Sequence, residues 1–399
     1  MKHILLLSIF FFSLITRGQE SFYDHLKFGS FQSNYCDTVI YDSEIQYSQF
    51  GYSGDAPLFV QIWFPSQSQK SIEYLKYGDF VINDDSSNLA QVYKELQVKM
   101  DQIAIRDGIA YTIDTDEPIL YSDKTTIDIL ELLKQIETRS IRANLPPELD
   151  FPTIVYHHGS QGLSYENSIM AEYFASLGYI FISANFHLPY ENTTYGLLPY
   201  ELEKENKHNQ SSAKTLINFA KSLSPENQVF YIGHSWGAQE GWCFLNDPTW
   251  VSGFVSMETT IEYKTDTLKI KEIWPYVYDA IKIKKNTFSI PILTSAAYDS
   301  TLSFDFFEGI NSKETIYASY KKPFAHNSYT SMYLMRYFLS KEINQPDSAL
   351  LFAQIEGYIT HLELIYLFTE SILNDETPDL SSLSESFKIS RVGKGDSHP

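Results

Sequence analysis

The chain has 399 residues, 43% of them hydrophobic, which is ample material for one large core and excludes a disordered protein. It carries 50 acidic against 30 basic residues, a formal net charge of −20 at pH 7. Because so negative a protein repels phosphate backbones and anionic lipids, we expect neither nucleic acid nor an anionic membrane surface as a partner.

The N-terminus has the pattern of a secretory signal peptide. Lys2 and His3 precede an apolar run from Ile4 to Ile15, which is too short to cross a membrane. The residues Thr16-Arg17-Gly18 follow this run. We predict a signal peptide over residues 1–18, cleaved near Gly18, and export to a periplasmic or secreted location. A short membrane anchor is the alternative. No later run could span a bilayer, so we expect no membrane span in the mature chain.

Short β-type runs alternate with helical patterns along the chain, which is typical of a mostly parallel sheet covered by helices on both faces. The helical patterns include apolar positions from Ile169 to Leu177 and from Ala213 to Leu223. We therefore predict an α/β fold with a single doubly wound domain over residues 19–399. The predicted strands are Leu58 to Phe64, Thr153 to His157, Ile180 to Ala184, Val229 to Ile232, Gly253 to Met257, Ile290 to Thr294 and Thr315 to Ala318.

Two stretches interrupt this alternation. Residues 66–150 are charged and helical in pattern, with helices predicted over Leu89 to Met100 and Thr125 to Arg142, and we interpret them as a helical insertion between early strands. Residues 263–287 carry several aromatic side chains between two late strands, where a lid over the site could lie. Ordinary packing of a connecting helix explains those aromatic residues equally well.

The chain contains two cysteines, Cys36 and Cys243. They could form one disulfide in an oxidising compartment, but Cys243 lies in an apolar stretch where a buried free thiol is the simpler interpretation. No cysteine pair or His-Glu-x-x-His run indicates zinc, and the adjacent His157 and His158 have no further ligands beside them. We expect neither a metal nor a cofactor.

Residues Gly233 to Gly237 read Gly-His-Ser-Trp-Gly and follow the apolar run Val229 to Ile232. In a Gly-x-Ser-x-Gly turn between a strand and a helix, the serine lies on a tight bend where side chains at the flanking glycines would clash. A helical run containing Phe244 and Leu245 follows, so the context fits such a turn. We predict Ser235 as the nucleophile of a serine hydrolase, with a structural Gly-Ser turn as the alternative.

A serine nucleophile also needs hydrogen-bond donors for the oxyanion that forms during acyl transfer. The glycine-bearing loop from His158 to Gly162 directly follows a predicted strand. Its backbone can aim the N–H of Ser160 or Gln161 at the same point as the N–H of Trp236. We predict these groups as the oxyanion hole, with a plain turn as the alternative for the loop.

The general base should follow the serine in enzymes built on this turn. His326 lies just beyond the last predicted strand, whereas His361 lies among apolar residues of a helical run, so we predict His326 as the base. Two carboxylates could orient its imidazole. Glu258 ends the strand Gly253 to Met257, and Asp299 follows the next strand, and spacing alone does not choose between them.

Five runs of the sequence match the motifs of one branch of enzymes. They are Gln61-Ile62-Trp63-Phe64-Pro65, Arg142-Ala143-Asn144, Phe151 to Gly159, Gly233 to Gly237 and His326-Asn327-Ser328-Tyr329. With these runs the chain resembles the platelet-activating-factor acetylhydrolase and dienelactone-hydrolase-like branch of the α/β hydrolases. The resemblance spans about Phe59 to Phe338 and implies the α/β-hydrolase fold.

The resemblance also bears on the triad acid. In the acetylhydrolases that acid follows the same strand as Glu258, so the resemblance favours Glu258 over Asp299. The chain departs from the family in having Glu for Asp at this position, Ala238 where a second glycine is usual, and the insertion at residues 66–150.

These residues predict hydrolysis of a small-molecule carboxylic ester through an acyl-enzyme, without a cofactor. Ser235 attacks, His326 takes and returns the proton, and Glu258 or Asp299 orients the imidazole. A peptidase or an acyltransferase on the same triad is the alternative among enzymes, since the fold does not determine the leaving group. A binding protein on a hydrolase scaffold, with an inert Ser235, is the alternative of another class.

Overall fold

The structure, a computed structural model, describes residues 22–67, 73–80, 88–103, 125–159, 162–191, 202–258, 271–272, 275–284, 288–296, 314–322, 324–335 and 348–392. The predicted signal peptide lies outside the described residues, as do Ser160, Gln161 and Asp299. Within the described part, no helix is both long and apolar enough to cross a bilayer.

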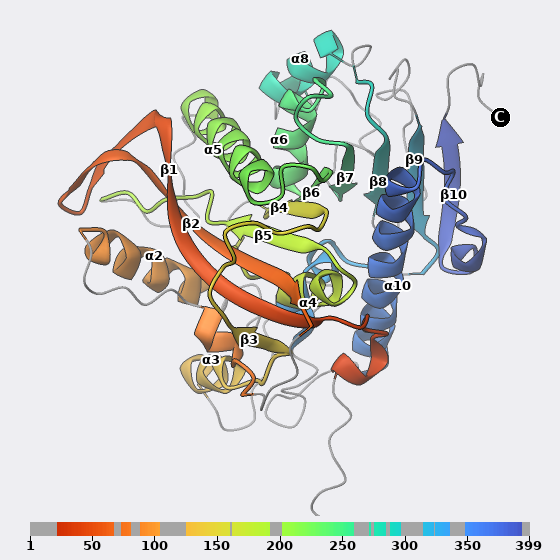
Figure 1. The fold of residues 1–399 in the computed structure, drawn as a ribbon, viewed down its shortest axis with the longest axis horizontal. Coiled ribbons are helices and arrows are strands. Elements are labelled where there is room, and N and C mark those ends of the chain that lie inside the picture. The colour runs from red at the N-terminus through yellow and green to blue at the C-terminus, as the bar shows by residue number, and fades with distance from the viewer. Residues whose placement is uncertain are drawn as a thin grey trace, which may run out of the picture.

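A sheet of ten strands forms the centre of the molecule (Figure 1). Its strands are β1 (Gln32–Gln49), β2 (Tyr52–Ser66), β3 (Ser140–Arg142), β4 (Thr153–His157), β5 (Ile180–Ala184), β6 (Val229–His234), β7 (Gly253–Met257), β8 (Ile292–Ala296), β9 (Thr315–Tyr320) and β10 (Phe387–Val392). Their order in the sheet is β10-β9-β8-β7-β6-β4-β5-β2-β1-β3. The six strands from β9 to β5 are parallel, whereas β2 and β10 pair antiparallel to their neighbours β5 and β9. The predicted α/β architecture with a mostly parallel sheet is confirmed.

Helices cover both faces of this sheet. The described helices are η1 (Phe22–His25), η2 (Tyr77–Phe80), α2 (Ala90–Ile103), α3 (Thr126–Lys134), α4 (Ser168–Ser176), α5 (Leu202–Leu223), α6 (Trp236–Phe244), α8 (Pro275–Lys284), η6 (His326–Tyr329), α9 (Ser331–Leu334), α10 (Ser348–Leu373) and η8 (Ser381–Leu383). In Figure 1, α5, α6 and α8 lie on one side of the sheet and α4 and α10 on the other. The chain is therefore doubly wound.

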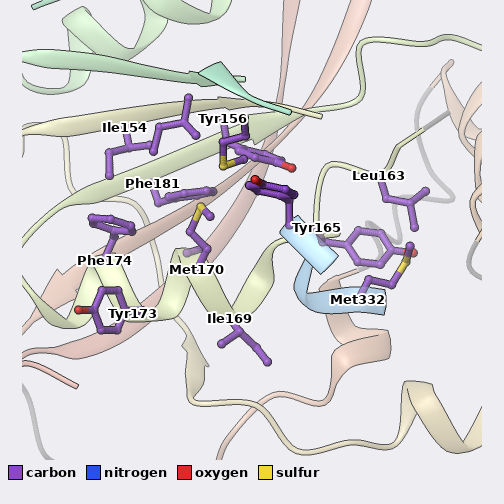
Figure 2. Close-up of a cluster of buried hydrophobic side chains, with 14 of the residues drawn as sticks. Ile154, Tyr156, Leu163, Tyr165, Ile169, Met170, Tyr173, Phe174, Phe181 and Met332 are labelled. Carbon is purple, nitrogen blue, oxygen red and sulfur yellow. The ribbon is translucent and has the colours of Figure 1, made fainter. Parts of the chain in front are cut away.

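Each face of the sheet has its own apolar core, because successive side chains of a strand point to opposite faces. On β4, Ile154 and Tyr156 belong to the core under α4 and α10, whereas Val155 belongs to the core under α5, α6 and α8. Figure 2 shows the first core, where Phe181 of β5 faces Met170 of α4. Strands buried on both faces read as continuous apolar runs, which is why β4 to β7 were predictable.

The chain between β2 and β4 forms α2, α3 and β3. Thr125 caps α3 in a capping box with Asp128, whose backbone N–H donates to the Thr125 hydroxyl at 3.2 Å. The prediction of one helix from Thr125 to Arg142 is wrong beyond Lys134. Ser140–Arg142 instead form β3, which pairs parallel to β1, because tertiary strand pairing overrides local helix propensity.

Two further predictions concern packing. Cys36 and Cys243 are buried and are not joined by a disulfide, so the disulfide alternative is wrong; burial raises the pKa of Cys36 to about 12. Within the predicted lid segment, α8 packs against α6 and buries Val277 completely, as the packing interpretation requires. Residues 263–270, 273–274 and 285–287 of that segment lie outside the described residues.

Candidate active site

Three of the predicted site residues lie at one edge of the sheet. Ser235 directly follows β6, Glu258 directly follows β7, and His326 begins η6 shortly after β9. These strands are parallel, so their carboxyl ends share an edge. Strand β4 lies between β5 and β6, and the helices after β4 and β6 cover opposite faces. In doubly wound folds, ligands bind beyond the carboxyl ends of the strands at such a switch point.

Ser235 occupies a strained turn. Its backbone has φ 51° and ψ −113°, a left-handed conformation that non-glycine residues rarely adopt. The turn is held by the Ser235 N–H, which donates to the Met257 carbonyl at 2.8 Å. A Cβ at Gly233 would come within 2.6 Å of the Ala238 Cα, and one at Gly237 within 2.7 Å of the His158 carbonyl oxygen. Both glycines are therefore required by close backbone approach.

His326 and Glu258 contact each other. Nδ1 of His326 contacts Oε2 of Glu258; the Glu258 side chain is completely buried, and 40% of the His326 side chain is exposed. Glu258 has φ 49°, and its N–H donates to the Ser295 carbonyl at 2.8 Å. Partial burial of the ring lowers the pKa of His326 and the neighbouring His234 lowers it further, so the imidazole is neutral near pH 7 and can accept a proton.

The predicted oxyanion loop lies against the serine turn. A Cβ at Gly159 would lie 3.2 Å from the Cβ of Ser235, a tight contact, so this glycine lies close against the serine turn. Trp236 is the first residue of α6 and follows the serine directly. Its indole Nε1 donates to the buried Glu240 carboxylate at 2.8 Å, which anchors the start of the helix.

Similarity to known proteins is found in the structure and not in the sequence. No protein-family model and no curated protein matches the sequence. Among solved structures, a ferulic acid esterase from Streptomyces cinnamoneus superposes with a TM-score of 0.52, at 11% identity, over 83% of this chain and 88% of that chain. The chain has the α/β-hydrolase fold. A dienelactone hydrolase from Anabaena variabilis matches with a TM-score of 0.34, at 14% identity, over 53% of this chain and 84% of that chain.

Two buried histidines, His157 and His158, make hydrogen bonds next to the turn that carries Ser235 in this α/β-hydrolase fold. Tyr231 donates to the Gly237 carbonyl at 2.9 Å and therefore accepts from Nδ1 of His157, 2.5 Å away. The Phe186 N–H donates to Nε2 of His158 at 3.2 Å, so Nδ1 of His158 carries the proton and donates to the Gly159 carbonyl at 2.8 Å. Burial lowers the pKa of His158 to about 4, which keeps this ring neutral.

These histidines are structural in their contacts. The residues that the structure describes contain no group of three His, Cys, Asp or Glu side chains placed to hold a metal ion. His361 is completely buried on α10, with Nδ1 3.3 Å from the Ser295 hydroxyl, and lies in the packed position that its apolar sequence context indicates.

One residue near the site, Glu166, was not predicted from the sequence. Glu166 is 3% exposed, and its Oε1 lies 3.8 Å from Nδ1 of His234, the residue before Ser235. A glutamate just before a helix is common, because its charge favours the helix N-terminus, so the sequence holds no signal that Glu166 is buried. Only the fold brings it beside His234.

Proposed function

We propose that the protein is a serine hydrolase that cleaves a small-molecule carboxylic ester by acyl transfer. The observation that carries this proposal is the strained Ser235 turn at the sheet edge that also carries the Glu258–His326 pair. Strained φ values of non-glycine residues cluster at functional sites, and both Ser235 and Glu258 have them. The α/β-hydrolase fold is consistent with this activity but does not by itself determine it.

Each residue of the triad has a defined role in the reaction. Ser235 Oγ attacks the ester carbonyl carbon while Nε2 of His326 takes its proton, since Nδ1 faces Glu258. Glu258 stabilises the imidazolium that forms. The His326 proton then passes to the leaving alcohol, and an acyl-enzyme remains. Water, deprotonated by His326, attacks the acyl carbon and releases the acid and free Ser235.

The oxyanion hole belongs to the same proposal. The Trp236 N–H, together with that of Ser160 or Gln161, would donate to the negatively charged oxygen of the tetrahedral intermediate. Support comes from the close approach of Gly159 to Ser235 and from the start of α6 directly after the serine.

Covalent labelling tests the function directly. The protein is incubated with a fluorophosphonate probe and with short p-nitrophenyl esters, and the labelled peptide is identified by mass spectrometry. We expect the probe on Ser235 and ester turnover in the wild type, and neither in Ser235→Ala with unchanged thermal unfolding. Absence of both labelling and turnover in the folded wild type would overturn the proposal and leave a binding protein on a hydrolase scaffold. Labelling of Ser235 without hydrolysis of any ester would favour a peptidase or an acyltransferase.

A further inference from the structure

Glu166 is a buried carboxylate that links three segments around the candidate site. Its Oε1 accepts a hydrogen bond from the Tyr156 hydroxyl at 2.6 Å, and its Oε2 accepts one from the Leu163 N–H at 3.2 Å. Leu163 directly follows the predicted oxyanion loop. A Cβ at Gly162, in that loop, would lie 2.6 Å from Oε2. The Glu166 side chain therefore holds the far end of the loop.

The second link runs to the nucleophile and the base. Oε1 of Glu166 lies 3.8 Å from Nδ1 of His234, which is buried directly before Ser235. Nε2 of His234 lies 3.2 Å from the carbonyl oxygen of His326, so it donates a hydrogen bond to that oxygen. The two imidazole rings lie 4.9 Å apart between their centroids. His234 therefore lies between the Glu166 carboxylate and the backbone carbonyl of His326.

The third link runs from the backbone of Glu166 to the segment that carries His326. The Glu166 carbonyl accepts hydrogen bonds from the Met332 N–H at 2.8 Å and from the Ser331 hydroxyl at 2.9 Å. The next residue, Asn167, donates to the Tyr329 carbonyl at 3.1 Å. The chain after His326 is thus held against the turn that contains Glu166.

The charge of Glu166 is compatible with this role. Burial raises the pKa of its carboxyl, but the neighbouring His234 and His158 and the hydrogen bond from Tyr156 together hold that pKa below its usual value. The carboxylate is therefore ionised at neutral pH. A buried charge destabilises the folded protein unless polar partners surround it. The ionised Glu166 carboxylate and its hydrogen-bond partners therefore depend on one another.

We propose that Glu166 is a positioning residue of the hydrolase site, acting through His234 on His326 and through Leu163 on the oxyanion loop. This inference rests on the proposed serine hydrolase function. Glu166 makes none of the proposed contacts with substrate, so its loss should slow the chemical step and leave substrate binding nearly unchanged. Misplacement of a catalytic group by about 1 Å can cost 10²-fold in rate.

Glu166→Gln tests the inference against a matched control. Glu172 is also a completely buried carboxylate, but it accepts hydrogen bonds from Tyr23 and Ser140, and none of these residues belongs to the proposed triad or oxyanion hole. Wild type, Glu166→Gln and Glu172→Gln are titrated with the fluorophosphonate, and kcat and KM for a p-nitrophenyl ester are measured per titrated site. We expect kcat of Glu166→Gln to fall roughly 10- to 100-fold with KM within about twofold. Glu172→Gln should keep kcat per site even if its unfolding temperature falls.

His234→Gln and the double variant test the route of the effect. If Glu166 acts through His234, the two losses in kcat should not multiply, and the double variant should be about as slow as the slower single variant. Losses that multiply would overturn the route through His234, and a wild-type kcat per site in Glu166→Gln would overturn the positioning role. Should Glu166→Gln fail to fold, the same measurements on His234→Gln decide, since a wild-type kcat per site there excludes the link. A wild type that the probe does not label would instead refute the proposed function itself.

Discussion

Glu258 is completely buried, has a positive φ and contacts Nδ1 of His326. If it is the triad acid, Glu258→Gln leaves the imidazole misoriented and its charged form unsupported. In a serine triad of another fold, the equivalent aspartate-to-asparagine change costs about 10⁴ in turnover. We therefore expect Glu258→Gln to lose about 10³- to 10⁴-fold in kcat for a p-nitrophenyl ester while remaining folded.

Asp299→Asn is the informative comparison for that variant. If Asp299 has no catalytic role, Asp299→Asn should change the free energy of unfolding by under about 0.5 kcal/mol and keep most of the turnover. The opposite pattern in the same ester assay would assign the acid to Asp299 and refute the role of Glu258. Large losses in both variants with intact folding would mean that both carboxylates act on His326.

At the scale of elements, the junction of β6 and α6 depends on backbone approach. A methyl group at Gly237 would collide with the carbonyl groups of His157 and His158, which are backbone atoms of β4 and the following loop and cannot rotate away. We expect Gly237→Ala to lower the free energy of unfolding by about 1–3 kcal/mol and to abolish labelling of Ser235. Urea unfolding and fluorophosphonate titration measure the two effects.

Gly51 provides the control for Gly237. It lies between β1 and β2 with φ +78°, and no atom lies within 4 Å of an added Cβ. Gly51→Ala should therefore cost about 1 kcal/mol through backbone strain alone, with full labelling of Ser235 in the folded fraction. Equal labelling in both variants would show that the β6–α6 junction tolerates a side chain at Gly237.

The strands themselves show what was predictable at this scale. β4, β5 and β7 have the predicted bounds, because strands buried on both faces are continuous apolar runs. β1 and β10 were missed, and both lie toward the margins of the sheet with many polar positions. Their strand character comes from pairing with β2 and β9, which local propensity does not contain.

At the scale of the whole molecule, buried histidines make stability depend on pH. Burial lowers the pKa of His158 to about 4 and that of His361 to about 3, whereas both are ordinary histidines, near 6.5, in the unfolded chain. Between these values the unfolded state binds more protons than the native state, so the free energy of unfolding falls as pH falls. Each such histidine removes about 2 kcal/mol between pH 7 and pH 5.

His361→Gln isolates one of these contributions. His361 contacts the Ser295 hydroxyl and the Met257 sulfur in the core beneath the site. The free energy of unfolding is measured in urea at pH 7 and at pH 5. Between these pH values it should fall by about 2 kcal/mol less in the variant than in the wild type, whatever the stability of the variant at pH 7. The same loss in both proteins would contradict a neutral, buried His361.

The sequence by itself determined the fold class and the candidate nucleophile, because both depend on local physics. Apolar runs mark strands buried on both faces, and a glycine-flanked serine between strand and helix specifies its own turn. Only the tertiary structure brought Glu258 against His326, and only it placed Glu166 beside His234. These contacts join segments far apart in the chain. Which residues meet depends on the order of the strands in the sheet and on which loops come together when both faces of the sheet are buried. Local periodicity of the sequence encodes neither.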